Sequence, residues 1–288
     1  MPSPMNDQDL AALQAAVAKL EASSLTMQIT GLVGKPIEGL LSKLPASANQ
    51  KIQKAVHLAL SKSVDAALWS LPGQDTTPEA ANKTHLGLAA VSGAVGGFFG
   101  MAGTLAELPV STTIMMRSVA DIARSEGFDV QDPIIKAECI QVFALGGPSK
   151  DDDAAESAYY GVRNAMVAVA QEVGKGLAEV AARQAAAAAG ASAANGGTLG
   201  AKEVGGLLVR LIEAVATRFG IQVTEKMAAQ AVPVIGALSG ATINTLFTNH
   251  FQNMASGHFA VLRLEQQYGK ALVQEQYLAI KERLQPKR

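Results

Sequence analysis

The stretch that decides the fold class is residues 52–68, which read IQKAVHLALSKSVDAAL. From Ile52 to Val64 an apolar residue recurs at every fourth position, which places these side chains along one face of an α-helix. Comparable helical spacings recur along the chain, whereas alternating β-branched runs bounded by turn residues are hard to find. We therefore predict an all-α protein, built as a single bundle of many helices.

Local signals place the ends of several helices. A short polar residue caps the free N–H groups of the first turn, proline fits that turn, and glycine follows the last one. We expect helices to begin at Asp7 or Asp9, at Thr77-Pro78, at Asp132-Pro133 and at Thr224, to bend at Pro109, and to end at Gly127 and Gly269. We predict N-terminal helices over 1–46 and a helical domain over 47–284, with an alanine- and glycine-rich loop at about 185–201.

The composition excludes some classes of protein. Of 288 residues, 49% are hydrophobic and 17% are charged, which is enough apolar material for a core and argues against intrinsic disorder. A net charge of -1 gives no basic surface for nucleic acid, so we expect no nucleic-acid partner. The single cysteine, Cys139, allows no intramolecular disulfide, and the first residues lack a signal-peptide pattern, so a cytoplasmic location is expected.

The sequence lacks the common motifs for catalysis and cofactor binding. No glycine pattern matches a dinucleotide-binding or phosphate-binding loop, and the four histidines are not spaced as zinc ligands. The stretch Gly236-Ala-Leu-Ser239-Gly240 has its serine one position too late for the nucleophile elbow of hydrolases. We therefore assign no catalytic residue, no cofactor and no metal.

Two long segments, residues 84–106 and 227–262, contain no Asp, Glu, Lys or Arg. Glycines spaced four residues apart let helix backbones approach closely, and these segments contain Gly93, Gly96, Gly97, Gly100, Gly236 and Gly240 at such spacings. Three interpretations stay open: a buried central hairpin, an amphitropic element that can be exposed to a membrane, and a membrane span. We favour the buried glycine-rich hairpin, because few residues of the first segment are large and apolar.

Polar residues follow the first uncharged segment. Glu107 is the first charge after it, and the polar residues beyond are Thr112, Thr113, Arg117 and Asp121. Arg117 and Asp121 are four residues apart and can form an ion pair on one helix face, while a bend at Pro109 would return Glu107 toward them.

The second uncharged segment carries its own polar face. Asn244 and His258 fall along one side of the predicted helix, and Arg263 follows the segment. We predict that Glu107, Arg117 and Asp121 form one coupled network beside this helix. The network is either a structural set of ion pairs or a ligand site, because charges beside apolar helices need partners in both cases.

Several ordered motifs resemble those of the EcsC family. They are Glu107-Leu-Pro109-x-Ser-Thr-Thr113, Met-Met-Arg117-Ser-x-Ala-Asp121-Ile-Ala-Arg124-x-Glu-Gly127, Val142-Phe-Ala-Leu-Gly-Gly147, Val232-Pro-Val-Ile-Gly236-Ala-x-Ser-Gly-Ala-x-Ile-Asn244-x-Leu-Phe, His258-Phe, Arg263-Leu-Glu265 and Tyr268-Gly269. The resemblance covers roughly Lys51 to Tyr277. It implies a helix-rich bacterial protein that can associate with a membrane. The family is named for a gene accompanying an ABC transporter and has no agreed biochemical activity, so the resemblance supplies no catalytic residues.

Three functions are consistent with these observations. The leading hypothesis is a non-enzymatic, amphitropic protein that binds lipid or another apolar ligand in or beside its glycine-rich hairpin, at the inner face of the membrane. The second is a hydrolase-like enzyme that uses Glu107, Arg117, Asp121 and His258 as acid–base groups. The third is an interaction partner of a transporter. An apolar cavity, an accessible cleft or an exposed apolar patch, respectively, would distinguish them.

Overall fold

The computed structural model describes residues 5–22, 24–33, 39, 41–42, 44, 47–64, 66, 80–98, 100–147, 158–188, 196–230 and 236–284. Within these ranges the chain forms ten α-helices, one 3-10 turn and no strand, which confirms the predicted all-α class. The helices are α1 (Asp7–Leu20), α2 (Leu25–Val33), α4 (Ala48–Ser63), α5 (Asn82–Phe98), α6 (Gly100–Ser125), α7 (Pro133–Gln141), α8 (Ala158–Ala188), α9 (Gly196–Gln230), α10 (Gly236–Tyr268) and α11 (Lys270–Leu284), and the 3-10 turn η2 spans Val142–Ala144.

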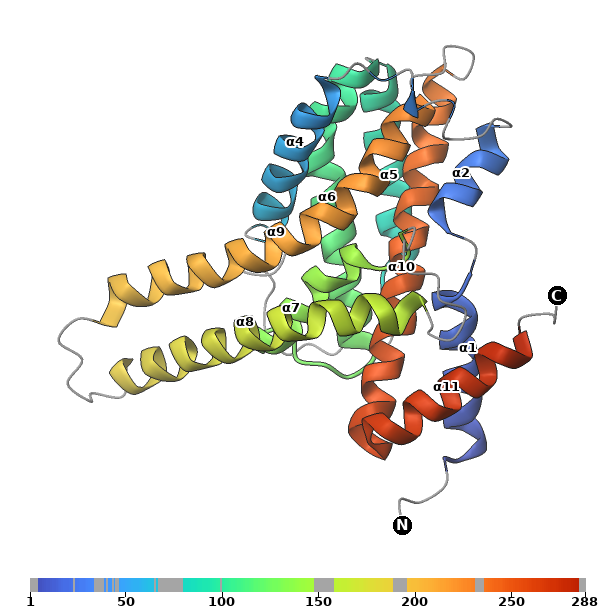
Figure 1. The fold of residues 1–288 in the computed structure, drawn as a ribbon. Coiled ribbons are helices and arrows are strands. Elements are labelled where there is room, and N and C mark those ends of the chain that lie inside the picture. The colour runs from blue at the N-terminus through green and yellow to red at the C-terminus, as the bar shows by residue number, and fades with distance from the viewer. Residues whose placement is uncertain are drawn as a thin grey trace.

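Helix α10 is the long element around which most of the others pack (Figure 1). Its most extensive neighbour is α5, while α1 and α11 pack near its other end. Phe247, Phe251 and Phe259 lie on its buried side and are fully enclosed. Phe251 stacks on Phe143 with ring centroids 5.0 Å apart and meets the Phe219 ring edge-on at 5.6 Å, so rings from other elements pack against this helix.

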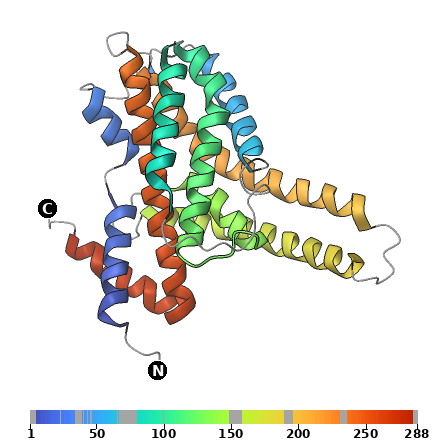
Figure 2. The same ribbon diagram turned by 180° about the vertical axis from the view of Figure 1, so that it is seen from behind.

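Helices α4, α6 and α5 form a layer on one side of α10 (Figure 2). Helix α6 lies in the middle, because it packs against both α4 and α5. The apolar stripe that defines α4 faces inward, and Ile52, Val56 and Leu60 are fully buried. The four-residue spacing in the sequence thus produces the predicted packing face.

Helices α8 and α9 run side by side and extend as a long arm away from the other helices (Figures 1 and 2). Val173, Val180 and Leu211 are buried along this arm. An exposed ion pair joins the two helices on its surface, with Arg210 Nη1 2.7 Å from Glu172 Oε1. Of the predicted loop at about 185–201, the two ends are helical, since α8 continues to Ala188 and α9 begins at Gly196, while residues 189–195 lie outside the described part of the chain.

The local end signals hold at several helices. Asp132 caps α7, where its side chain accepts a hydrogen bond from the backbone N–H of Ile134 at 2.7 Å. Gly127 and Gly269 follow α6 and α10 with φ of 90° and 85°, a conformation that glycine adopts without a steric penalty. Helix α1 begins at Asp7 as predicted, and the residue that caps it is Asn6. The predicted start at Thr77-Pro78 lies outside the described residues.

One predicted helix start is wrong, and one predicted bend falls within a helix. Pro109, the position of the predicted bend, lies inside α6, which begins at Gly100 after α5 ends at Phe98. Thr224 is not a cap but an interior residue of α9, where its hydroxyl donates to the carbonyl of Gly220 at 2.7 Å. In both places the helix continues through a residue whose local preference is to interrupt it, because tertiary packing outweighs propensity.

The uncharged segments do not form the two arms of one hairpin. Residues 84–106 span most of α5 and the start of α6, and residues 227–262 span the end of α9 and most of α10. The close contact that the glycines predicted does occur between α5 and α10. A Cβ atom added at Gly93 would lie 2.5 Å from the carbonyl oxygen of Gly240, so only glycine permits this approach.

The other glycines differ in what they contact. A Cβ added at Gly96 would lie 2.8 Å from Cβ of Glu107, so this glycine lets α6 approach α5. Gly97, Gly100 and Gly236 are helical, and the structure describes nothing further of their surroundings. Among the described residues, no helix combines the length and the hydropathy that crossing a membrane requires.

Candidate functional site

A buried polar cluster joins α5, α6, α9 and α10, and Glu107 is at its centre. Asn244 Nδ2 donates to Glu107 Oε1 at 3.0 Å, and Ser92 Oγ donates to the same oxygen. Lys226 Nζ lies 3.6 Å from Glu107 Oε2 and also donates to Asn244 Oδ1. The prediction that Glu107 lies beside the helix of Asn244 is therefore confirmed, and Lys226 is an additional member.

Close helix packing holds this cluster in place. Asn244 can reach the backbone of α5, where its Nδ2 also donates to the carbonyl of Ala89 at 2.9 Å. Lys226 is fully buried, with its ammonium 5.2 Å from the centre of the Phe247 ring. Burial lowers the pKa of Lys226, and the nearby Glu107 carboxylate opposes that shift. The cluster is thus an ion pair completed by an amide and a hydroxyl.

Asp121 belongs to a second, separate set of contacts. Its carboxylate oxygens lie 2.7 Å from His85 Nε2 and 2.5 Å from Arg124 Nη2. Burial raises the pKa of Asp121, but the hydrogen bonds from His85 and Arg124 outweigh that effect and hold the pKa below its ordinary value. Arg117, the predicted partner, donates instead to the carbonyl of Ala66 at 3.0 Å. The predicted network of Glu107, Arg117 and Asp121 is therefore wrong.

Thr112 and Thr113 use their hydroxyls within α6. Thr112 Oγ1 donates to the carbonyl of Leu108 at 2.7 Å, and Thr113 Oγ1 donates to that of Pro109 at 2.8 Å. Such bonds back to the preceding turn are common for threonine inside helices. Both hydroxyls are therefore hydrogen-bonded within α6, to the carbonyl groups of Pro109 and the residue before it.

His258 is fully buried between two polar partners. Its Nδ1 lies 2.9 Å from the Tyr159 hydroxyl, and its Nε2 lies 3.0 Å from Glu138 Oε2. A neutral imidazole satisfies both contacts if Nε2 donates to the carboxylate and Nδ1 accepts from the hydroxyl. Burial raises the pKa of Glu138, but the hydrogen bond from His258 and the charges of His258 and Arg163 together lower it further, so the pKa lies below its ordinary value.

Arg263 lies at the end of α10 that faces α1. Its Nε donates to Glu126 Oε2 at 3.0 Å, and its Nη1 lies 3.4 Å from Asp9 Oδ1. The Tyr268 hydroxyl also donates to Asp9 at 2.7 Å. Arg263 therefore ties three helices together at one edge of the bundle.

The eight candidate residues thus fall into separate sets within the described part of the chain. The hydrolase hypothesis requires Glu107, Arg117, Asp121 and His258 to converge, whereas their observed partners belong to different clusters. The described residues also contain no group of three His, Cys, Asp or Glu that could hold a metal ion. The geometry gives no support to an acid–base centre built from these four residues.

Sequence reasoning missed several members of these clusters. Lys226 is the member that the sequence could most readily have predicted, because it is the last charge before residues 227–262 just as Glu107 is the first after 84–106. Two opposite charges that border two uncharged segments are natural partners once those segments pack together. His85, Glu138 and Tyr159 carry no comparable signal, since their partners are distant in the sequence.

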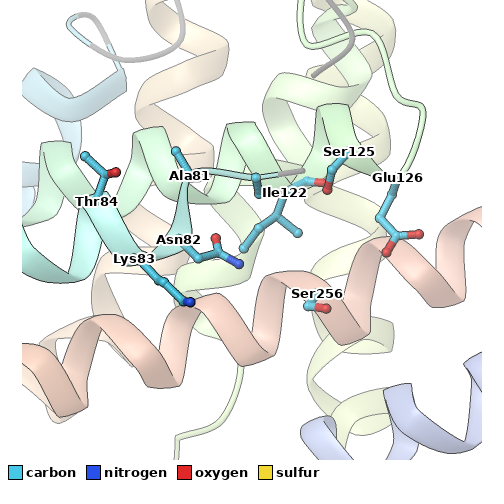
Figure 3. Close-up of a pocket in the computed structure, with 9 residues that line it drawn as sticks. Ala81, Asn82, Lys83, Thr84, Ile122, Ser125, Glu126 and Ser256 are labelled. Carbon is cyan, nitrogen blue, oxygen red and sulfur yellow. The ribbon is translucent and has the colours of Figure 1, made fainter. Parts of the chain in front are cut away.

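A pocket of about 560 Å³ lies where the start of α5, the end of α6 and α10 converge (Figure 3). Asn82 and Lys83 line it from α5, Ser125 and Glu126 from the end of α6, and Ser256 from α10. Figure 3 shows Lys83 and Glu126 on opposite sides of the space, with Ser256 between them. None of the eight predicted site residues lines this pocket, although Arg263 holds Glu126.

Comparison with known proteins identifies the family of the chain. The sequence profile of the EcsC protein family matches residues 7–264. The chain belongs to the EcsC protein family. This EcsC match includes every helix from α1 to α9 and most of α10, so all eight candidate residues lie inside it. No curated protein and no solved structure shows significant similarity to this EcsC chain.

Proposed function

We propose that this protein binds peripherally to a membrane surface that contains anionic lipid. The surface that binds is the solvent side of the α4, α6 and α5 layer, which we call the basic-apolar face. It is defined by Lys51, Lys54, Leu58, Lys62, Lys83, Leu88, Val91 and Val110. The observation that carries the proposal is the combination of exposed lysines and exposed apolar side chains on these three helices. Figure 2 shows that the three helices are neighbours.

The exposed charges of this face are positive. Lys51, Lys54 and Lys62 are exposed along one side of α4, and Lys83 is exposed at the start of α5. Helices α4 and α5 contain no Asp or Glu. Helix α6 contains Glu107 and Asp121, whose side chains are only 9% and 13% exposed and are paired with cations. A lysine near an anionic bilayer contributes about 1 kcal/mol to binding.

The same face exposes large apolar side chains. Leu58 of α4, Leu88 and Val91 of α5 and Val110 of α6 are each about half exposed or more, and Val91 reaches 68%. Apolar side chains on a helix that lies in the interface enter the boundary between headgroups and acyl chains, which adds to the electrostatic attraction. This proposal retains the expectation that residues 84–106 meet lipid, and it locates that contact on the surface of the bundle.

Vesicle sedimentation with the purified full chain tests the proposal. We expect the protein to bind vesicles of phosphatidylcholine and phosphatidylglycerol, to bind pure phosphatidylcholine much more weakly, and to be released by salt, which screens the lysines. The double variant Lys51→Glu/Lys54→Glu should bind the anionic vesicles at least ~30-fold more weakly, from about 1 kcal/mol for each lysine lost.

The matched control changes the same charge elsewhere. Lys175→Glu/Lys270→Glu alters two exposed lysines of α8 and α11, away from the basic-apolar face. This control should retain most of the binding, because only charges close to the bilayer contribute strongly. If both double variants lose binding equally, or if the unmodified chain does not bind anionic vesicles, the proposed surface is wrong.

A further inference from the structure

The pocket at the start of α5 has the size and the polar lining of a small-molecule site. Its volume of about 560 Å³ is within the range of ligand pockets in proteins, roughly 300–1,000 Å³. Its walls come from three helices that the fold holds together, α5, α6 and α10. Lys83 is the one lining residue that this pocket shares with the basic-apolar face, and no member of the Glu107 cluster lines it.

Polar atoms at this end of α5 and α6 lack partners. Asn82 lines the pocket, and its Oδ1 is buried without a hydrogen bond, as are His85 Nδ1 and Arg124 Nε nearby on the same two helices. Buried polar atoms without partners are uncommon and are costly to leave unsatisfied. The side-chain amide of Asn82 can present either its oxygen or its nitrogen to a ligand by rotation.

Charges of opposite sign stand on opposite walls. The Lys83 ammonium extends from α5, and the Glu126 carboxylate extends from the end of α6 (Figure 3). Arg263 binds Oε2 of Glu126, and Glu126 is itself one of the residues that line the pocket. Ser256 lies between the two walls, and its hydroxyl oxygen accepts from Lys19 Nζ at 2.6 Å. A purely anionic ligand would be repelled by Glu126 and a purely cationic one by Lys83, so the arrangement favours a ligand with both charges.

The pocket and the proposed membrane-binding surface share the start of α5. Thr84 lines the pocket, and Leu88 and Val91 follow it at intervals of four and three residues on the same face of α5. The first turn of α5 also forms part of the wall, and the positive end of a helix dipole favours a phosphate. A lipid headgroup that carries an ammonium and a phosphate combines these requirements.

We propose that this pocket binds a phosphoethanolamine group, with its phosphate toward Lys83 and Asn82 and its primary ammonium toward Glu126. The group is either part of a membrane lipid or a free soluble ester. The lipid source rests on the proposed membrane binding, whereas recognition of the group itself does not. Three N–H donors distinguish a primary ammonium from the quaternary ammonium of choline, which cannot donate to Glu126.

Calorimetric titration of the full chain with soluble headgroups tests this inference without a membrane. Glycerophosphoethanolamine should bind at least ~10-fold more tightly than glycerophosphocholine or glycerol phosphate. Ala81→Trp should abolish this binding, because Ala81 lines the pocket and a large ring there fills it without removing a side-chain hydrogen bond. Ala11→Trp, at an exposed position of α1, is the matched control and should bind normally.

Vesicle binding distinguishes a membrane lipid from a free soluble ester as the source of the phosphoethanolamine group. It also distinguishes the pocket inference from the proposed binding of the basic-apolar face to membranes. Adding phosphatidylethanolamine to phosphatidylglycerol vesicles should strengthen binding of the Ala11→Trp variant but not that of Ala81→Trp. Equal strengthening of both variants would show that the pocket does not take the group from a membrane lipid. Failure to bind glycerophosphoethanolamine, or equal binding of all three soluble compounds, overturns the pocket inference. Neither result affects binding to vesicles of phosphatidylcholine and phosphatidylglycerol, which tests the basic-apolar face alone.

Discussion

Gly93 of α5 lies against the carbonyl oxygen of Gly240 in α10, and a Cβ atom at position 93 would be 2.5 Å from that oxygen. The same Cβ would lie 2.8 Å from Cγ of Asn244, which binds Glu107. The absence of one side chain at Gly93 therefore permits both the helix contact and the polar cluster beside it.

Gly93→Ala should destabilise the protein by ~1–3 kcal/mol, because backbone and a bonded amide must move to make room for the methyl group. Gly87→Ala, in the same helix, has nothing within 4 Å of the new Cβ and should be neutral or slightly stabilising. Urea denaturation of the two variants measures the difference. Equal effects would show that helix propensity, and not close packing, governs both positions.

The buried ion pair should show strong coupling. Glu107→Gln leaves Lys226 without its carboxylate and should cost ~3–5 kcal/mol, and Lys226→Met should cost a similar amount by leaving the carboxylate without its cation. The double variant Glu107→Gln/Lys226→Met leaves no unpaired buried charge. Its loss in free energy of unfolding should therefore be well below the sum of the two single-variant losses. A double-mutant cycle in urea measures this coupling. Additive costs would mean that the two charges are independent.

The buried pair of Arg163 and Glu265 should depend on the shape of the guanidinium group. Arg163 Nη1 and Nη2 donate to the two carboxylate oxygens at 2.7 and 2.6 Å, and both side chains are buried. Arg163→Lys cannot reproduce this paired geometry and should cost ~1–3 kcal/mol. Arg210→Lys is the matched control, since the pair of Arg210 with Glu172 is exposed and its loss should change stability by less than ~0.5 kcal/mol. Thermal unfolding of both variants tests the contrast.

His250 should make the fold sensitive to acid. Burial lowers its pKa from 6.5 to about 4, so the unfolded chain binds a proton more readily than the folded one between these values. The folded state therefore loses stability as pH falls from 6.5 toward 4, by ~3 kcal/mol from this group at the acid end. His250→Asn should flatten that part of the profile of unfolding free energy against pH. A profile parallel to that of the unmodified protein would contradict the assignment.

Much of the fold could be predicted because its signals are local. The spacing from Ile52 to Val64 sets the buried face of α4, and Gly127, Asp132 and Gly269 mark helix ends through their own backbone or side-chain chemistry. Thr224 carries the same kind of signal, yet α9 continues through it. Its neighbours Val223, Glu225 and Lys226 are buried, so packing on several sides outweighs a capping preference.

The site was harder to predict because its pairings depend on which helices meet. Arg117 and Asp121 have the spacing of an ion pair, but Asp121 binds His85 from another helix and Arg124 one position nearer in the same helix turn. His258 binds Glu138 and Tyr159, which are 120 and 99 residues away in the sequence. Helical spacing predicts which residues share a face, and it contains no information on the partner that the face meets.

Tyr277 shows that the family match and the folding unit have different ends. The match stops at residue 264, whereas α11 begins at Lys270 and places Tyr277 in the core, stacked on Tyr159 and bonded to Glu21 at 2.7 Å. Helix α11 thus packs against α1 and covers the tyrosine rings beside His258. A recombinant fragment designed from the matched residues alone would lack α11 and would expose the tyrosine rings beneath it to water.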